Sequence, residues 1–488
     1  MYLGIDIGTS GVKVVVADAD DHIHASASYR LEVSRPHSGW SEQHPDDWWT
    51  ATQGCFDELA RQHPGLMAQV RGIGLSGQML GAVVVNDQDR ALRSGILWND
   101  GRALEECSEL LRRAPDIGHR SGCTPDPGFT APKLLWLAKH EPEVFAKTDC
   151  VMLPKDFVRL RLTGQRATEP SDGCGMLVME TESRRWSDEL CTAAGWSADR
   201  LPPIIDSWAS GGDLLPDLAA RWKIPAGTPV AAGAGDNMAA SVGVGVARPG
   251  DAIITIGTSG VVCIVDSQYR PLPDKAVLTH AHAAPDAFLS MGCVMAATAS
   301  VDWVLGIGGK SLSTMAGEAD RLWTEGRAAE APVMLPFLNG IRTPHNRPAT
   351  RGLLAGLSLS TDLGMLGWAV MEGVSFQFIE CLEAQAEVGL KPENLQIVGG
   401  GAQNRLWCQM IASLLDRPVD LPSGRDVAAS LGAARLGRVA AGDAEAAACL
   451  SAKPASEATI APDAGMRDLL LGRYERYLAF QREAGELL

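Results

Sequence analysis

Two segments of the chain carry nearly the same pattern of apolar and polar residues. The first reads Ile-Asp-Ile-Gly-Thr-Ser-Gly over residues 5–11, and the second reads Ile-Thr-Ile-Gly-Thr-Ser-Gly over 254–260. A mostly apolar run follows each copy. Apolar runs on either side of a short turn rich in glycine and hydroxyl side chains predict a β-hairpin. Repetition at about half the chain length indicates a duplicated domain, because a solenoid repeat would have a much shorter period.

The rest of the chain alternates between strand and helix patterns. Helix starts are expected after the polar segment 41–47 and at residues 133–137. Short apolar runs at 70–75 and 82–85 predict strands around the turn formed by residues 77–81. This alternation in both halves is typical of the α/β class.

Three further expectations concern the outline of the chain. The segment 170–213, rich in Gly, Ser and Trp, is expected at the surface, and a charged amphipathic helix is expected over 463–488. Pro249-Gly250 precedes the second hairpin, so we place a domain boundary near residue 246. The expected domains are residues 1–245 and 246–488.

Composition narrows the classes of partner. The formal net charge of −16 argues against nucleic acid, whose phosphates would be repelled. No apolar stretch is long enough to span a bilayer, and the N-terminus lacks the basic region of a signal peptide. Eleven cysteines without a C-x-x-C pair are typical of reduced, buried thiols. We therefore expect a cytoplasmic protein without membrane or nucleic-acid partners.

The two hairpin turns are candidate phosphate sites. Backbone N–H groups and small hydroxyls at such turns can surround an anion, which points to Gly8, Thr9 and Ser10 in the first copy and to Gly257, Thr258 and Ser259 in the second. The alternative is two ordinary tight hairpins. A near-verbatim second copy favours two domains that hold one polyphosphate from opposite sides.

Two aspartates accompany these turns. Asp6 lies inside an apolar strand, where a carboxylate is costly unless it is paired or holds a cation, so we predict an Mg²⁺ site there, direct or through water. The alternative is a carboxylate satisfied by turn N–H groups. Asp236 lies between glycines and a helix start just before the second hairpin. An N-cap is its plainest role, but phosphoryl transfer needs a carboxylate that accepts a proton from the attacking hydroxyl, and we assign Asp236 as that base.

A third turn follows a predicted strand. Residues 397–404 read Ile-Val-Gly-Gly-Gly-Ala-Gln-Asn, in which the glycines allow a flat adenosine to lie against the backbone at Gly400, Gly401 and Asn404. A plain strand-to-helix turn is the alternative.

Together these motifs resemble those of the actin and hexokinase superfamily, and within it the FGGY family of carbohydrate kinases. Residues 128–137 are similar to the first signature of that family, and residues 352–373 to the second. The resemblance covers nearly the whole chain. It implies two actin-like, ribonuclease H-like ATPase domains around a central cleft, with ATP and Mg²⁺ as cofactors. It also implies a small-molecule sugar as substrate and leaves room for a homodimer.

Within the family, the chain is most similar to kinases that convert D-xylulose to D-xylulose 5-phosphate. That resemblance implies Asp236 and Asp6 as catalytic residues and sugar contacts at Met79, Leu80, Asp100, Asp236 and Asn237. One position departs from the pattern, because such kinases usually have His where this chain has Leu80. A kinase for another ketose, a deoxyketose or a polyol therefore stays open. A nucleotide-gated protein such as an actin-like polymer or a chaperone ATPase is the alternative from another class.

Overall fold

The computed structural model describes residues 1–309, 311–424 and 427–486. Both predicted hairpins are present. Strand β1 (Tyr2–Ile7) pairs antiparallel with β2 (Gly11–Ala17), and β14 (Asp251–Ile256) pairs in the same way with β15 (Gly260–Asp266). The strands of each pair are joined by residues 8–10 and by residues 257–259, the two candidate phosphate sites, which are here termed the first and second phosphate turns.

The two hairpins belong to two sheets with the same topology, which confirms the duplication. The first sheet runs β3 (Ile23–Arg30), β2, β1, β5 (Gly72–Gly77), β12 (Pro229–Ala231), β11 (Ser210–Asp213), with β13 (Ala234–Gly235) beside β5. The second runs β17 (Phe288–Val294), β15, β14, β20 (Asn394–Val398), β21 (Val419–Pro422), β22 (Ser456–Ile460), with β16 (Leu278–Ala281) outside β17. From β3 and β17 onward, the successive pairs are antiparallel, antiparallel, parallel, parallel and antiparallel in both sheets. The α/β class is thus confirmed.

The remaining described elements surround these sheets. Short strand pairs are formed by β4 (Glu42–Gln43) with β7 (Gly95–Ile96), β6 (Val83–Val85) with β8 (Cys150–Met152), β9 (Met179–Glu180) with β10 (Arg185–Trp186), and β18 (Val333–Leu335) with β19 (Leu353–Ala355). The helices of the first half are α1 (Pro45–Gln62), α2 (Pro64–Met67), α3 (Leu104–Arg113), α4 (Ile117–Ser121), α5 (Thr130–His140), α6 (Pro142–Lys147), α7 (Pro154–Thr163), α8 (Pro170–Gly173), α9 (Asp188–Ala193), α10 (Pro216–Trp222) and α11 (Asp236–Gly243). Those of the second half are α12 (Thr298–Gly308), α13 (Leu312–Thr324), α14 (Leu363–Ala386), α15 (Arg405–Leu415), α16 (Ala428–Ala440), α17 (Ala446–Leu450) and α18 (Ala464–Glu483).

Several boundaries differ from the sequence expectation. Helix α1 begins at Pro45, with His44 as its N-cap, because residues 42–43 pair as a strand. Helix α5 begins at Thr130, three residues before the expected start. The surface expectation for 170–213 is wrong for residues 170–179, which are buried. The last helix begins as expected, whereas residues 487–488 of that prediction lie outside the described residues.

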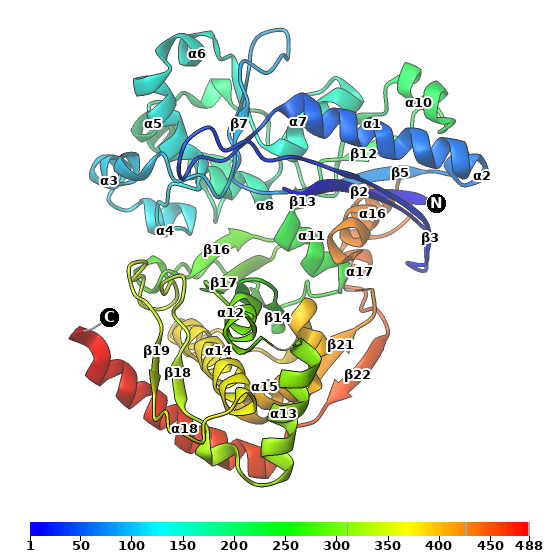
Figure 1. Ribbon diagram of the computed structural model, residues 1–488. Coiled ribbons are helices and arrows are strands. Elements are labelled where there is room, and N and C mark those ends of the chain that lie inside the picture. Colours follow the sequence, from blue (N-terminus) through cyan, green and yellow to red (C-terminus); the bar gives the residue numbers. More distant parts are fainter. Residues whose placement is uncertain (310, 425–426, 487–488) are drawn as a thin grey trace.

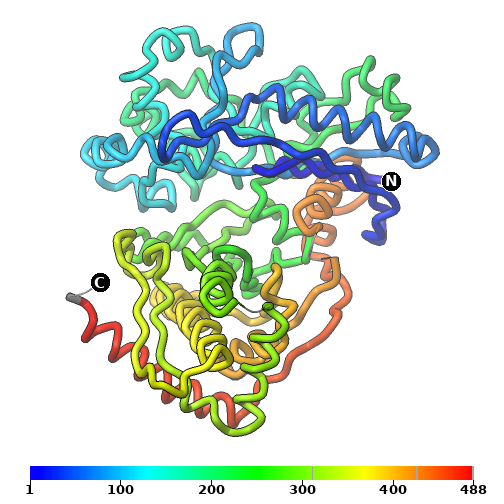
Figure 2. The backbone as a smooth tube through the Cα atoms, viewed as in Figure 1, coloured from blue at the N-terminus to red at the C-terminus, as the bar shows by residue number. Residues whose placement is uncertain are grey.

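Helix α16 belongs to the last part of the chain but packs on the first sheet. Figures 1 and 2 show it, in orange, beside the blue strands of that sheet, with α11 nearby between the two halves. Helices α1 and α7 contact the first sheet as well. The approach of α16 is close because Gly4 and Gly74, which are register partners in β1 and β5, present no side chain. A Cβ on Gly4 would lie 1.8 Å from the carbonyl oxygen of Ser430, and one on Gly74 would lie 1.9 Å from that of Ala433.

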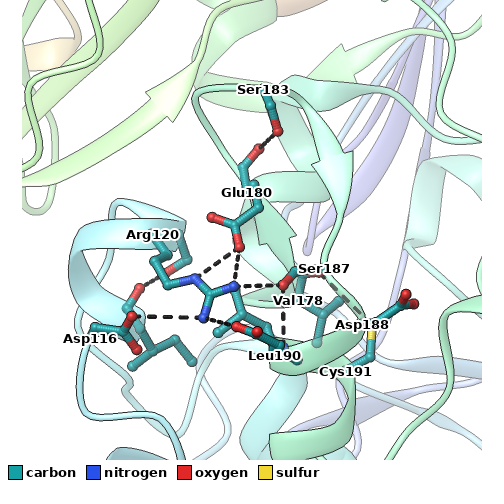
Figure 3. A network of polar contacts seen from close by, with 12 residues as sticks. Asp116, Arg120, Val178, Glu180, Ser183, Ser187, Asp188, Leu190 and Cys191 are labelled. Carbon is teal, nitrogen blue, oxygen red and sulfur yellow. Dashed lines mark hydrogen bonds and ion pairs between the residues drawn. The ribbon is translucent and has the colours of Figure 1, made fainter.

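Arg120 joins helix α4 to the segment that contains β9 and α9, and these three elements are here termed the α4–α9 lobe (Figure 3). Arg120 donates from Nε to Glu180 at 2.8 Å, from Nη1 to Glu189 at 2.7 Å and from Nη2 to Ser187 at 3.0 Å, while Asp116 lies 3.7 Å away. These contacts hold α4 against β9 and α9.

The same region bridges the two halves of the chain. The Tyr269 hydroxyl donates to the carbonyl of His119 at 2.7 Å, and Arg342 forms an ion pair with Asp126 at 2.8 Å. The two sheets are therefore connected at this lobe as well as through α11 and α16.

Among the described helices, none combines the length and the apolar character needed to cross a membrane. All eleven cysteines are free thiols, and ten of them are buried.

Candidate active site

Three strands of the first sheet end at the same place. In the register of β1, β5 and β13, Asp6 and Ala234 both lie opposite Ser76, and Gly235 lies opposite Gly77. Asp236 directly follows Gly235. Ligands in open α/β sheets bind at such carboxyl ends of strands. The structure thus brings both predicted catalytic aspartates to one edge.

Asp236 is the first residue of α11 rather than its N-cap, which is Gly235. Its Oδ1 accepts hydrogen bonds from the Asn237 backbone N–H at 2.7 Å and from Asn237 Nδ2 at 3.1 Å. Burial raises the pKa of the Asp236 carboxyl to about 7, and the negative charge of Asp6 adds to the rise. A carboxylate with such a pKa is well matched to accept a proton near neutral pH.

Asp6 faces a cavity between the two halves. Its Oδ1 accepts a hydrogen bond from the Ser76 hydroxyl at 2.9 Å, and burial raises its pKa. The cavity, of about 240 Å³, is lined by Asp6, Lys13 and Asn237 from the first half and by Thr255 from the second. Asp6 and its counterpart in the repeat, Thr255, therefore border one space.

Both phosphate turns keep backbone donors available. The N–H of Gly8 closes the first turn onto Gly11, and that of Gly257 closes the second onto Ser259. The N–H groups of Thr9, Ser10, Thr258 and Ser259 have no hydrogen-bond partner among the residues that the structure describes. They are the donors that an anion could use.

The turn at residues 78–81, here termed the sugar turn after the sugar contacts predicted for Met79 and Leu80, lies against Gly235, the residue before Asp236. Met79 packs on Gly235, where an added Cβ would lie 2.7 Å from its sulfur. Leu80 has a positive φ of 67° and points toward Gly175, where an added Cβ would lie 2.3 Å from Leu80 Cδ2. The Leu80 carbonyl accepts hydrogen bonds from Lys133 Nζ at 2.9 Å and from the Thr130 hydroxyl at 3.0 Å. Helix α5, which carries the first signature, thus fixes the turn beside Asp236.

Both carboxylate oxygens of Asp100 accept hydrogen bonds from other residues of the protein. Its side chain is fully buried, and Arg102 donates to both of its oxygens, at 2.8 Å from Nε and 2.7 Å from Nη2. The backbone N–H of Ser41 donates at 2.6 Å. In this conformation Asp100 holds Arg102 in place, and its predicted sugar contact stays a prediction.

A larger cavity of about 730 Å³ lies in the second half. Gly400, Gly401 and Asn404 line it, together with residues of α12, α13 and α14. A Cβ on Gly401 would lie 2.3 Å from Ile256 Cγ2, so the glycine lets this turn approach β14. Asn404 caps α15 by accepting from the Trp407 N–H. The three predicted adenosine residues are therefore gathered at one cavity beside the second hairpin.

Sequence reasoning missed two groups near the site. Lys13 is the register partner of Asp6, and its position as the one cation in an apolar strand could have marked it. The second group is a fully buried cluster in which Lys155 Nζ lies 2.7 Å from Asp156 and 3.6 Å from Asp172. Sequence spacing offers no sign of this cluster, because two separate helices, α7 and α8, form it.

Both halves of the chain are similar to known carbohydrate kinases. Residues 1–243 match the model of the N-terminal domain of the FGGY family of carbohydrate kinases, and residues 252–441 match that of its C-terminal domain. The xylulose kinase of Escherichia coli K12 is 40% identical over 90% of this chain and 90% of its own length. The xylulose kinase of Bacillus subtilis is 34% identical over 90% of this chain and 88% of its own.

Solved structures agree along the whole chain. The crystal structure of a xyloylose kinase from Brucella ovis has a TM-score of 0.96 and 38% identity, with all of both chains covered. The structure of xylulose kinase from Rhodospirillum rubrum has a TM-score of 0.92 and 25% identity, covering 100% of this chain and 99% of that one. The two-domain arrangement predicted from the repeated hairpins is confirmed by these matches.

Proposed function

Because the chain belongs to the FGGY family of carbohydrate kinases, we propose that it transfers the γ-phosphoryl group of ATP to a terminal hydroxyl of D-xylulose, giving D-xylulose 5-phosphate. The observation that carries this proposal is the position of Asp236 between Gly235, which packs on Met79 of the sugar turn, and Asn237, which lines the cavity shared by the two halves. Similarity to xylulose kinases over 90% of the chain supports the choice of sugar. These relatives also favour a kinase over an actin-like polymer or a chaperone ATPase.

In the proposed reaction, Asp236 accepts the proton of the attacking sugar hydroxyl. Asn237 orients the carboxylate by donating twice to Oδ1, which leaves Oδ2 for that proton. The free N–H groups of the two phosphate turns bind the phosphates, and the ammonium of Lys13 adds positive charge beside them. Phosphoryl transfer depends mainly on such positioning and electrostatic stabilisation.

Asp6 is the residue we propose to hold Mg²⁺, directly or through water. Asp6 suits this role because it lines the cavity and because only its Oδ1 is bonded to a described residue. Its Oδ2 is therefore available to the ion. Carboxylate and water oxygens are the ligands that Mg²⁺ prefers. The bound ion would neutralise charge on the β- and γ-phosphates.

A coupled assay of ADP release tests the function. With ATP and Mg²⁺, D-xylulose should give the highest kcat/KM in a panel of ketoses, deoxyketoses and polyols. A higher value for another class of sugar would overturn the assignment of D-xylulose and keep the kinase.

Leu80 is expected to shift the choice of sugar. Related kinases usually have a hydrogen-bonding His here, and a sugar hydroxyl that meets Leu80 instead loses a partner, at a cost of roughly 1–3 kcal/mol. A hydrogen or methyl in its place gains apolar contact. We therefore expect Leu80→His to raise kcat/KM for D-xylulose relative to 1-deoxy-D-xylulose by about tenfold or more.

The measurement is the ratio of kcat/KM for the two sugars in the parent and in Leu80→His. The variant Leu80→Met, similar in volume and apolar, is the matched control and should keep the parent ratio. An unchanged ratio in Leu80→His would mean that Leu80 does not set specificity, as its contact with Gly175 allows.

We also propose a cytoplasmic location, a homodimer and domain bounds of 1–245 and 246–488. Location in the cytoplasm agrees with the free thiols. The bounds agree with the two sheets, except that α16 lies in the second range of residues and packs on the first sheet.

A further inference from the structure

The hydroxyl of Thr9, in the first phosphate turn, is already engaged by protein side chains. Its Oγ1 donates to Gln78 Oε1 at 3.0 Å and accepts from Trp98 Nε1 at 3.0 Å. Gln78 begins the sugar turn. The phosphate turn and the sugar turn are therefore joined side chain to side chain.

This link is part of a closed ring. Gln78 Nε2 donates to Gln43 Oε1 at 2.9 Å, and Gln43 Nε2 donates to the backbone carbonyl of Thr9 at 2.7 Å. Gln43 and Gln78 are 3% and 2% exposed, so bonds lost here are not replaced freely by water. The ring Thr9–Gln78–Gln43 therefore holds the two turns at a fixed distance.

Two tryptophans determine the direction of every bond in the ring. The indole N–H of Trp48 can only donate, and it donates to Gln43 Oε1 at 2.9 Å. Gln43 Nε2 must then face Thr9, and Gln78 must donate to Gln43. The Oε1 atom of Gln78 therefore faces Thr9 and accepts the single hydroxyl proton of that residue. The indole N–H of Trp98 donates to the oxygen of the same hydroxyl.

The two phosphate turns, alike in sequence, therefore differ in chemistry. Thr258 is an exposed residue and its hydroxyl bonds to no residue that the structure describes, so its proton is available to a phosphate. The proton of Thr9 is committed to Gln78 while the ring is closed.

We propose that Thr9, Gln43 and Gln78 are positioning residues that hold the first phosphate turn and the sugar turn as one unit. The ring aligns the attacking hydroxyl of the sugar with the γ-phosphate, and the Thr9 hydroxyl is a structural link rather than a phosphate donor. This inference rests on the proposed function, since it needs a sugar at residues 78–81 and ATP at residues 8–10. A misplacement of about 1 Å in such a site can lower the rate 10²-fold.

A double-mutant cycle tests the ring. Thr9→Val and Gln78→Met keep the shape of the side chains and remove the bond between them. Each should lower kcat about tenfold to 10²-fold and raise KM for the sugar, with the affinity for ADP unchanged. The double variant should be no worse than either single variant, because both break one ring. Thr9→Ser keeps the hydroxyl and should restore the parent values.

Thr258→Val is the matched control in the second turn. It should raise KM for ATP, leave KM for the sugar unchanged, and combine additively with Gln78→Met. Additive effects of Thr9→Val and Gln78→Met, or an effect of Thr9→Val confined to ATP, would overturn the proposal. Should Gln78→Met fail to fold, the effect of Thr9→Val on KM for the sugar, and its rescue in Thr9→Ser, decide alone.

The parent is assayed first on D-xylulose. Lack of turnover there counts against the proposed sugar. The cycle is then run with the panel sugar that the parent does phosphorylate, so the two failures stay distinct.

Discussion

Asp236→Asn is expected to lower kcat by roughly 10² or more while ATP still binds. The amide keeps the size of the side chain but cannot accept the proton of the attacking hydroxyl. The measurement is kcat and KM for both substrates, together with the affinity for ADP and the melting temperature. Near-normal turnover in a folded variant would contradict the assignment of Asp236 as the base.

The pH profile gives the same test a second readout. The base works in its ionised form, so with a pKa of about 7 the parent's kcat/KM for the sugar should fall about tenfold per pH unit below pH 7. Above that value it should level off. The pH profile of Asp236→Asn should lack this fall below pH 7. If kcat/KM of the variant still fell in the same way, the titration would belong to another group.

Gly74→Ala is expected to destabilise the fold by about 3 kcal/mol, the upper end of the usual cost of overpacking. The added Cβ would lie 1.9 Å from the Ala433 carbonyl oxygen, and a clash with backbone forces α16 away from the first sheet. Thermal or denaturant unfolding measures the effect. Gly317→Ala is the control, because that helical glycine has nothing within 4 Å of the added atom, and it should be neutral or stabilising. Equal stability of the two variants would mean that α16 can move at no cost.

The sequence predicted the parts of the site that depend on local pattern. The hairpins, the strand before Gly399 and the helix after Asp236 follow from short runs of residue types, and the near repeat indicated two matching sheets. The FGGY signatures predicted the family, which the comparisons confirmed.

What the sequence could not provide is the partner of each polar side chain. The bonds of Asp100 to Arg102 and Ser41 leave no trace in the sequence, and the proposed role of Thr9 depends on Gln78, 69 positions away. The buried stretch 170–179 was misassigned to the surface because Gly and Ser occur both in exposed loops and where backbones pack closely. Such pairings are made by the tertiary fold, and no periodicity records them.

The position of α16 also sets the order in which the protein can be completed during synthesis. Strands β1, β2, β3 and β5 of the first sheet are complete once residue 77 has been synthesised. Helix α16, which covers this sheet, is complete only at residue 440. At about 5–20 residues per second, the ribosome needs roughly 20–70 s to make the chain between them. For that time one apolar face of the sheet lacks its cover, so a nascent chain halted near residue 245 should be cut rapidly by protease, and one extended past 440 should resist. Equal resistance of the two would mean that the early strands are protected by something other than α16.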